Sequence, residues 1–108
     1  MPTAATRDVL IQAPDLAAAR AFYQDQLGLA LFMDEPNMLG FEAGGLRLFV
    51  EQRPAFGPVL EFLVDDLAAA KTQLLAAGCR LVEEDAAIPR LYLTDPFGLT
   101  FNVGESGP

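Results

Sequence analysis

Carboxylates are the side chains in this sequence with the most evident chemical use. The chain has 15 Asp and Glu residues against 7 Lys and Arg residues, no histidine, one cysteine (Cys79) and one serine (Ser106). Because histidine is absent, Ser-His-Asp and Cys-His nucleophilic sites are excluded within the chain, and so are imidazole ligands for zinc, nickel or iron. A carboxylate can still bind a cation, or act as a general base where burial raises its pKa.

The overall charge narrows the range of partners. A formal net charge of −8 on 108 residues repels nucleic-acid phosphates and anionic lipid surfaces. No apolar stretch approaches the ~20 residues of a membrane-spanning helix, and residues 1–10 lack the apolar segment of a signal peptide. We therefore expect a cytoplasmic protein whose partner is a small molecule. The hydrophobic fraction of 52% predicts a packed core in a single domain.

Two capped helices are predicted by an internal repeat. The segment Asp15-Leu-Ala-Ala-Ala-Arg20 recurs as Asp66-Leu-Ala-Ala-Ala-Lys71, and each copy opens an Ala- and Leu-rich stretch that stops at a glycine, Gly28 or Gly78. Aspartate at an N-cap accepts hydrogen bonds from free backbone N–H groups, and glycine after the last turn can adopt the left-handed conformation. Apolar residues at helical spacing make both helices amphipathic, so each needs a sheet to cover.

Extended segments surround the helices in the same order twice. The predicted strands are residues 8–13, 29–33, 38–42 and 46–51 in the first half, and residues 59–64, 80–84, 90–94 and 99–103 in the second. Asp95-Pro96-Phe97-Gly98 fits a type I turn, so the last two strands form a hairpin. The sequence thus predicts an α+β fold of two βαβββ modules, residues 7–51 and 59–104, joined by a linker of residues 52–58 within one domain.

Alternation along the strands separates two faces of the predicted sheet, because successive side chains point to opposite sides. The helices are expected to cover the apolar set: Val9, Ile11, Ala13, Leu48, Val50, Leu60, Phe62, Val64, Leu99, Phe101 and Val103. The opposite face is mixed, as in small-molecule sites. Its residues are the candidate ligand-binding set: Asp8, Leu10, Gln12, Arg47, Phe49, Glu51, Val59, Glu61, Leu63, Thr100 and Asn102. A solvated or dimer-covered face is the plainer interpretation.

The order of these motifs resembles a known superfamily. The motifs are Asp15-Leu16, Ala21-Phe22-Tyr23, Leu27-Gly28-Leu29, Val64-Asp65-Asp66-Leu67 and Asp95-Pro96-Phe97-Gly98. Together they look like the glyoxalase, bleomycin-resistance and extradiol-dioxygenase superfamily, also called vicinal oxygen chelate. The resemblance implies two modules whose mixed, curved sheets form a cup for a small ligand, often within a homodimer. In the enzymes of the superfamily, the resemblance implies a divalent metal in that cup.

The positions that the resemblance assigns to metal ligands are poor in donors. They fall on Asp8, Phe49, Val59 and Asn102, of which only Asp8 is anionic. Since a zinc, nickel or iron site needs at least three suitable protein donors, we expect no metal and no other cofactor. A hard cation held by Asp8, Asn102 and waters is the alternative.

The expected function is therefore the capture of a small cationic or amphipathic molecule. Asp8, Glu51 and Glu61 beside Phe49 suit an organic cation through ion pairing and cation–π contact. The resemblance adds that bleomycin-resistance members also dispense with the metal and sequester a cationic drug. One alternative is a metal-independent lyase or isomerase with Glu61 as its general base. Another is a non-catalytic interaction module.

Several of these residues have plainer interpretations. Asp8 can be a solvated residue at a strand start, and Glu61 can pair with Arg47 across the sheet. Tyr92 is expected in the core, because the facing of its strand is not settled by the sequence. Phe56 and Phe97 are expected as lid residues or dimer contacts. Cys79 is expected to be a structural thiol, with no cationic base near it in sequence.

Overall fold

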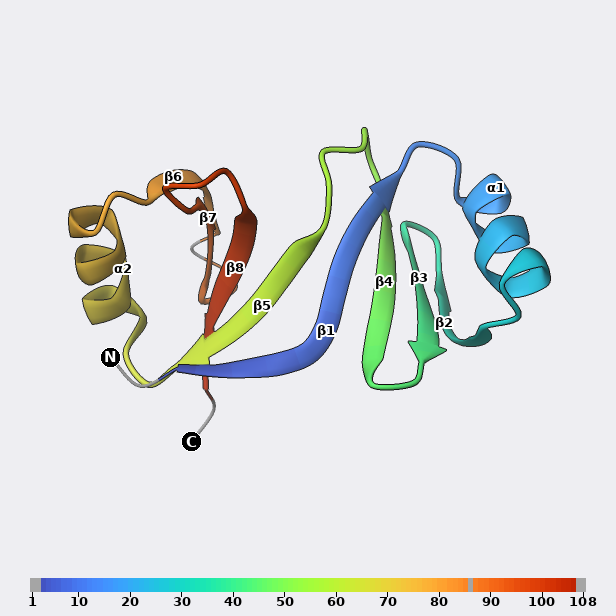
Figure 1. Cartoon of the computed structure of the whole chain (residues 1–108), viewed down its shortest axis with the longest axis horizontal. Coiled ribbons are helices and arrows are strands. Elements are labelled where there is room, and N and C mark those ends of the chain that lie inside the picture. The colour runs from blue at the N-terminus through green and yellow to red at the C-terminus, as the bar shows by residue number, and fades with distance from the viewer. Residues whose placement is uncertain (1–2, 86, 107–108) are drawn as a thin grey trace. The chain divides into compact units, whose positions relative to one another are not determined.

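The computed structural model describes residues 3–85 and 87–106. This part of the chain has the expected α+β architecture and divides into two compact units (Figure 1). The N-terminal unit comprises residues 7–58, and the C-terminal unit comprises residues 59–85 and 87–106 together with residues 3–6. Among the described residues, no helix has the length and apolar character needed to cross a membrane.

The N-terminal unit is a four-stranded mixed sheet with one helical segment. Its elements are β1 (Thr3–Ala13, of which residues 3–6 lie in the C-terminal unit), α1 (Leu16–Arg20), the π-helical segment η1 (Ala21–Gln26), β2 (Ala30–Glu35), β3 (Met38–Ala43) and β4 (Leu46–Gln52). The strand order is β2-β3-β4-β1. The β2–β3 and β3–β4 hairpins are antiparallel, whereas β1 and β4 run parallel.

The C-terminal unit repeats this topology. Its elements are β5 (Val59–Val64), α2 (Leu67–Ala76), β6 (Arg80–Asp85), β7 (Arg90–Thr94) and β8 (Thr100–Glu105). The strand order is β5-β8-β7-β6, with β5 and β8 parallel and the two hairpins antiparallel. The predicted turn before β8 is confirmed, because the Gly98 N–H donates to the Asp95 carbonyl at 3.2 Å and the Asp95 side chain accepts from the Phe97 and Leu99 N–H groups.

The helices begin where the repeated motif predicts. Asp15 accepts a hydrogen bond from the Ala18 N–H at 3.1 Å, and Asp66 accepts one from the Ala69 N–H at the same distance. Each such cap stabilises a helix by about 1 kcal/mol. The basic residue that ends each copy of the motif forms an ion pair with the strand that follows the helix. Arg20 pairs with Asp34 of β2 at 2.9 Å, and Lys71 pairs with Glu84 of β6 at 2.8 Å.

Each unit has its own apolar core between sheet and helix. In the N-terminal unit Ala19, Leu39, Phe41 and Val50 are buried, with partly buried side chains of β1, β2, β4 and the helical segments packed around them. In the C-terminal unit the buried residues are Val64, Ala70, Leu91, Leu93, Phe101 and Val103. These clusters contain most of the predicted helix-facing set: Ile11, Ala13, Leu48, Val50, Leu60, Phe62, Val64, Phe101 and Val103.

Four expectations about the elements differ from the structure. The first helix is α-helical only to Arg20, and the Leu27 N–H then bonds the Phe22 carbonyl five residues back, which is the π-helical pattern. β1 begins at Thr3, so Asp8 is not at a strand start. Leu99 precedes β8, is 37% exposed and is not among the residues of the C-terminal core cluster. Val9 belongs to neither of the two clusters formed by the described residues.

Candidate ligand-binding faces

The candidate residues lie on the sheet faces opposite the helices and divide between the units. The N-terminal face carries Asp8, Leu10 and Gln12 on β1, directly opposite Arg47, Phe49 and Glu51 on β4. The C-terminal face carries Val59, Glu61 and Leu63 on β5 and Thr100 and Asn102 on β8. Each face is held by hydrogen-bonded strands, so its side chains have defined cross-strand neighbours.

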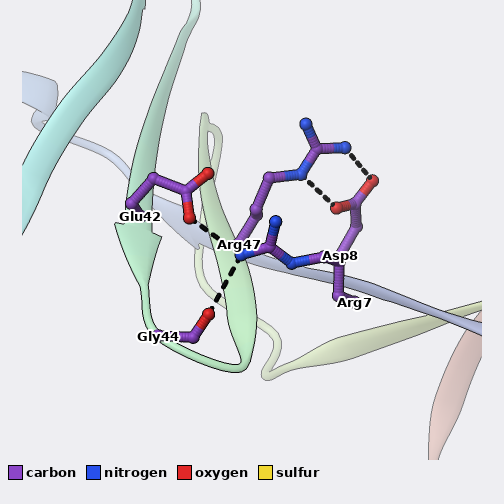
Figure 2. Close-up of polar contacts among 5 residues, drawn as sticks. All are labelled: Arg7, Asp8, Glu42, Gly44 and Arg47. Carbon is purple, nitrogen blue, oxygen red and sulfur yellow. Dashed lines mark hydrogen bonds and ion pairs between the residues drawn. The ribbon is translucent and has the colours of Figure 1, made fainter.

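On the N-terminal face, Asp8 is bound by Arg47. The Arg47 guanidinium donates from Nε to Asp8 Oδ1 at 2.8 Å and from Nη2 to Oδ2 at 3.0 Å, the bidentate arrangement drawn in Figure 2. The Asp8 side chain is 22% exposed and that of Arg47 is 37% exposed. A second pair in the same view is more exposed: Arg7 donates to Glu42 Oε2 at 2.8 Å and to the Gly44 carbonyl at 3.0 Å. Within the N-terminal unit, the carboxylate that holds Arg47 is thus that of Asp8.

The Arg47 guanidinium also lies over two aromatic rings. Its Cζ is 5.6 Å from the ring centroid of Phe32 and 5.5 Å from that of Phe49, within the range of cation–π attraction. The two rings meet edge to face with centroids 5.5 Å apart. Gly40 makes room for this arrangement, because a Cβ there would lie 2.8 Å from Phe32 Cζ. On the N-terminal face, the Arg47 guanidinium is thus a cation held by one carboxylate and two aromatic rings.

Gln12 and Glu51 anchor the linker to the N-terminal face. Gln12 is 6% exposed, and its Oε1 accepts hydrogen bonds from the backbone N–H groups of Phe56 at 2.9 Å and Gly57 at 3.0 Å. Because an N–H group only donates, these contacts fix the orientation of the amide. Its Nε2 is buried without a hydrogen-bond partner among the described residues. Glu51 accepts from Arg53 at 3.1 Å, and the Arg53 guanidinium lies 5.0 Å from the Phe56 ring centroid.

The C-terminal face presents a row of three polar side chains. Glu61 is directly opposite Asn102, which in turn is directly opposite Tyr92 of β7. Adjacent strands lie about 4.7–4.9 Å apart, so the row spans roughly 10 Å. Asn102 is 4% exposed, and its Oδ1 is buried with no hydrogen-bond partner in the described part of the chain. The half-buried Glu61 carboxylate likewise has no hydrogen bond or ion pair to any of residues 3–85 and 87–106.

Apolar and hydroxyl groups flank this row. Val59 is fully buried, Leu63 lies opposite Gly104, and Thr100 lies opposite Thr94. The C-terminal face therefore combines hydrocarbon surface with oxygen acceptors.

Tyr92 was expected in the core, and the structure shows that expectation to be wrong. Leu91 and Leu93 are 1% and 0% exposed in the cluster under α2, so Tyr92 between them faces the other way. The signal was present in the sequence: pairing the hairpin outward from the Asp95–Gly98 turn brings Tyr92 opposite Asn102. Phe32 was missed for a different reason. It lies at a register shift between Leu31 and Met33, which alternation along β2 does not reveal.

Cys79 is a partly buried thiol whose pKa is raised. It contacts the core of the C-terminal unit, and burial, together with the negative charge of Asp95, raises the pKa of its thiol. Since the thiolate is the reactive form, we expect iodoacetamide to modify Cys79 more slowly in the folded protein than in urea at neutral pH. The rise in rate with pH should also begin at higher pH in the folded protein. Coincident pH–rate profiles for the two states, measured by mass spectrometry, would contradict this expectation.

The residues at the metal-ligand positions implied by the resemblance do not fit a divalent metal. Phe49 and Val59 carry no donor atom, Asn102 offers one neutral oxygen, and both carboxylate oxygens of Asp8 are bonded to Arg47. Within the ranges that the structure describes, no three His, Cys, Asp or Glu side chains are grouped as a metal ion requires. Any binding or catalysis at these faces must therefore come from their polar side chains.

Solved structures with a similar fold cover nearly the whole chain. A glyoxalase/bleomycin resistance protein/dioxygenase superfamily member from Vibrio splendidus 12B01 matches with a TM-score of 0.65 and 14% identity over 97% of this chain and 100% of that one. Methylmalonyl-CoA epimerase from Mycobacterium tuberculosis matches with a TM-score of 0.60 and 25% identity, covering 94% of this chain and 87% of that one. The Mn(II)-bound glyoxalase from Novosphingobium aromaticivorans matches with a TM-score of 0.61 and 26% identity over 92% of this chain and 38% of that one.

The sequence itself also matches a family model. No curated protein matches it in a sequence comparison. The model of the glyoxalase-like domain, however, matches residues 8–104, which include both βαβββ units almost completely. This agrees with the resemblance seen in the motifs, and the chain belongs to the glyoxalase-like domain family of the vicinal oxygen chelate superfamily.

Proposed function

We propose that this chain binds a small organic cation of amphipathic character, such as a cationic drug, and does so without a metal ion. One observation carries the proposal: two neighbouring oxygen acceptors of the C-terminal face, Glu61 and Asn102, lack a partner among the described residues. An enclosed acceptor without a donor is unfavourable, and native proteins retain few of them. A ligand with a positively charged donor group would satisfy both oxygens.

The surroundings of these oxygens suit the rest of such a ligand. The Tyr92 ring stands next to Asn102 and can contact a cation through its face. Leu63, which is half-buried, adds hydrocarbon surface on β5, the strand that carries Glu61. The formal charge of −8 raises the local concentration of cations and speeds their encounter with the protein.

The N-terminal face offers an internal example of the same recognition. There a guanidinium is held by the Asp8 carboxylate and by the rings of Phe32 and Phe49. A role of Asp8 and Phe49 in holding a ligand cation would require Arg47 to be displaced. The C-terminal face needs no such displacement, so we assign the cation to Glu61 and Asn102.

The test compares three probes that share one hydrocarbon chain: n-hexylammonium, hexan-1-ol and hexanoate. Titration followed by isothermal calorimetry and by amide chemical shifts should show hexylammonium binding about tenfold or more tighter than hexan-1-ol, as expected for a hydrogen bond to a charged group. Hexanoate should bind most weakly. The advantage of the cation should shrink as salt is raised, because screening weakens the attraction.

Glu61→Gln should bring the affinity for hexylammonium down to that for hexan-1-ol. Glu84→Gln is the matched control, since it removes the same charge from the same unit but at a residue paired with Lys71. Equal binding of the three probes, or an equal loss in the two variants, would contradict the proposal. The homodimer expected from the sequence stays a prediction, which light scattering of the purified protein would check.

A further inference from the structure

Asn102 is the most enclosed polar side chain of the C-terminal face. It is 4% exposed, and its Oδ1 is buried and has no hydrogen-bond partner in the part of the chain that the structure describes. Its neighbours in the row, Glu61 on β5 and Tyr92 on β7, are only half-buried. The row therefore places one hidden acceptor between two accessible groups.

We propose, building on the function proposed above, that this protein selects cations that carry N–H donors, such as primary or secondary ammonium, amidinium or guanidinium groups, over quaternary ammonium ions. The selecting residue is Asn102. Glu61 attracts any cation, and the Tyr92 ring face can contact any cation. Only a hydrogen-bond donor satisfies the amide oxygen between them.

The burial of Asn102 also favours cations with N–H donors. Because Asn102 Oδ1 is buried, a ligand reaches it only when neighbouring side chains such as Glu61 or Tyr92 move aside, and a compact N–H group needs the smaller movement. A trimethylammonium group presents a broad shell of C–H groups, so it would stop at the carboxylate and leave the amide oxygen unsatisfied. The two classes of cation are thus separated by both hydrogen bonding and shape.

The experiment compares n-hexylammonium with n-hexyltrimethylammonium, which have the same charge and chain. The unaltered protein should bind hexylammonium about tenfold or more tightly, the effect of one hydrogen bond between a charged donor and an otherwise unsatisfied acceptor. Equal affinities would overturn the inference while leaving the proposed function intact. Failure of both cations to bind would overturn the proposed function and the inference with it.

Two variants separate selection from structural support. Asn102→Leu should lose the preference between the two cations, yet its melting temperature should stay the same or rise, because an unsatisfied buried polar group is replaced by hydrocarbon. Asn102→Asp should keep the preference, since both terminal atoms of aspartate are oxygens. A preference that survives in Asn102→Leu would show that another residue selects the ligand. If Asn102→Leu does not fold, the test rests on Asn102→Asp. Loss of the preference in that variant would contradict the inference.

Discussion

Replacing Phe41 by Ala is expected to lower the free energy of unfolding by about 3–5 kcal/mol. The Phe41 side chain is fully buried in the core of the N-terminal unit, where it packs against the Tyr23 ring with centroids 5.7 Å apart. The substitution removes a large apolar surface from that core and leaves a cavity that the surrounding strands cannot close completely. Small domains have a free energy of unfolding of about 5–15 kcal/mol, so the expected loss is a large part of the stability of the fold.

The matched control for this prediction is Phe97→Ala. Phe97 is 93% exposed in the turn before β8, so the same change of side chain should alter the free energy of unfolding by no more than about 0.5 kcal/mol. Urea denaturation followed by circular dichroism would measure both variants. A difference of less than about 1 kcal/mol between them would show that Phe41 is not part of a close-packed core.

The second prediction concerns the two ion pairs that join β1 to the β3–β4 hairpin. In a double-mutant cycle, Asp8→Asn and Arg47→Gln should show a coupling energy of about 1–2 kcal/mol, above the range for exposed pairs. Arg47 makes two hydrogen bonds to Asp8 and covers two rings, so its guanidinium is held in place before the pair forms. Less side-chain entropy is then lost on pairing.

The Arg7–Glu42 pair provides the control cycle. Its side chains are 49% and 44% exposed, and exposed pairs contribute about 0.2–1 kcal/mol. Raising the salt concentration should weaken the coupling of Arg7 with Glu42 more than that of Asp8 with Arg47, because the latter is less accessible to solvent. Equal coupling energies with equal salt dependence would mean that burial and the aromatic rings contribute nothing to the Asp8–Arg47 pair.

The sequence alone was sufficient to predict most of the elements of this fold, though not all of their bounds. Asp15 and Asp66 mark the helix starts, and alternation along the strands places Val50 and Phe101 under the helices. These features follow from contacts between residues close in the chain, namely caps, turns and the period-two geometry of strands. The π-helical segment after Arg20 had no comparable local signal, so the first helix was predicted to continue unbroken.

Tertiary structure decided which side chains meet on the two faces. Asp8 and Arg47 are 39 residues apart and meet because β1 and β4 are paired in parallel with a particular register. Phe32 reaches Arg47 through a register shift in β2, and Tyr92 joins Asn102 through the hairpin of β7 and β8. The residue types on each face can be read from alternation, but the partner of each charge is fixed by strand order and register, which are properties of the whole sheet.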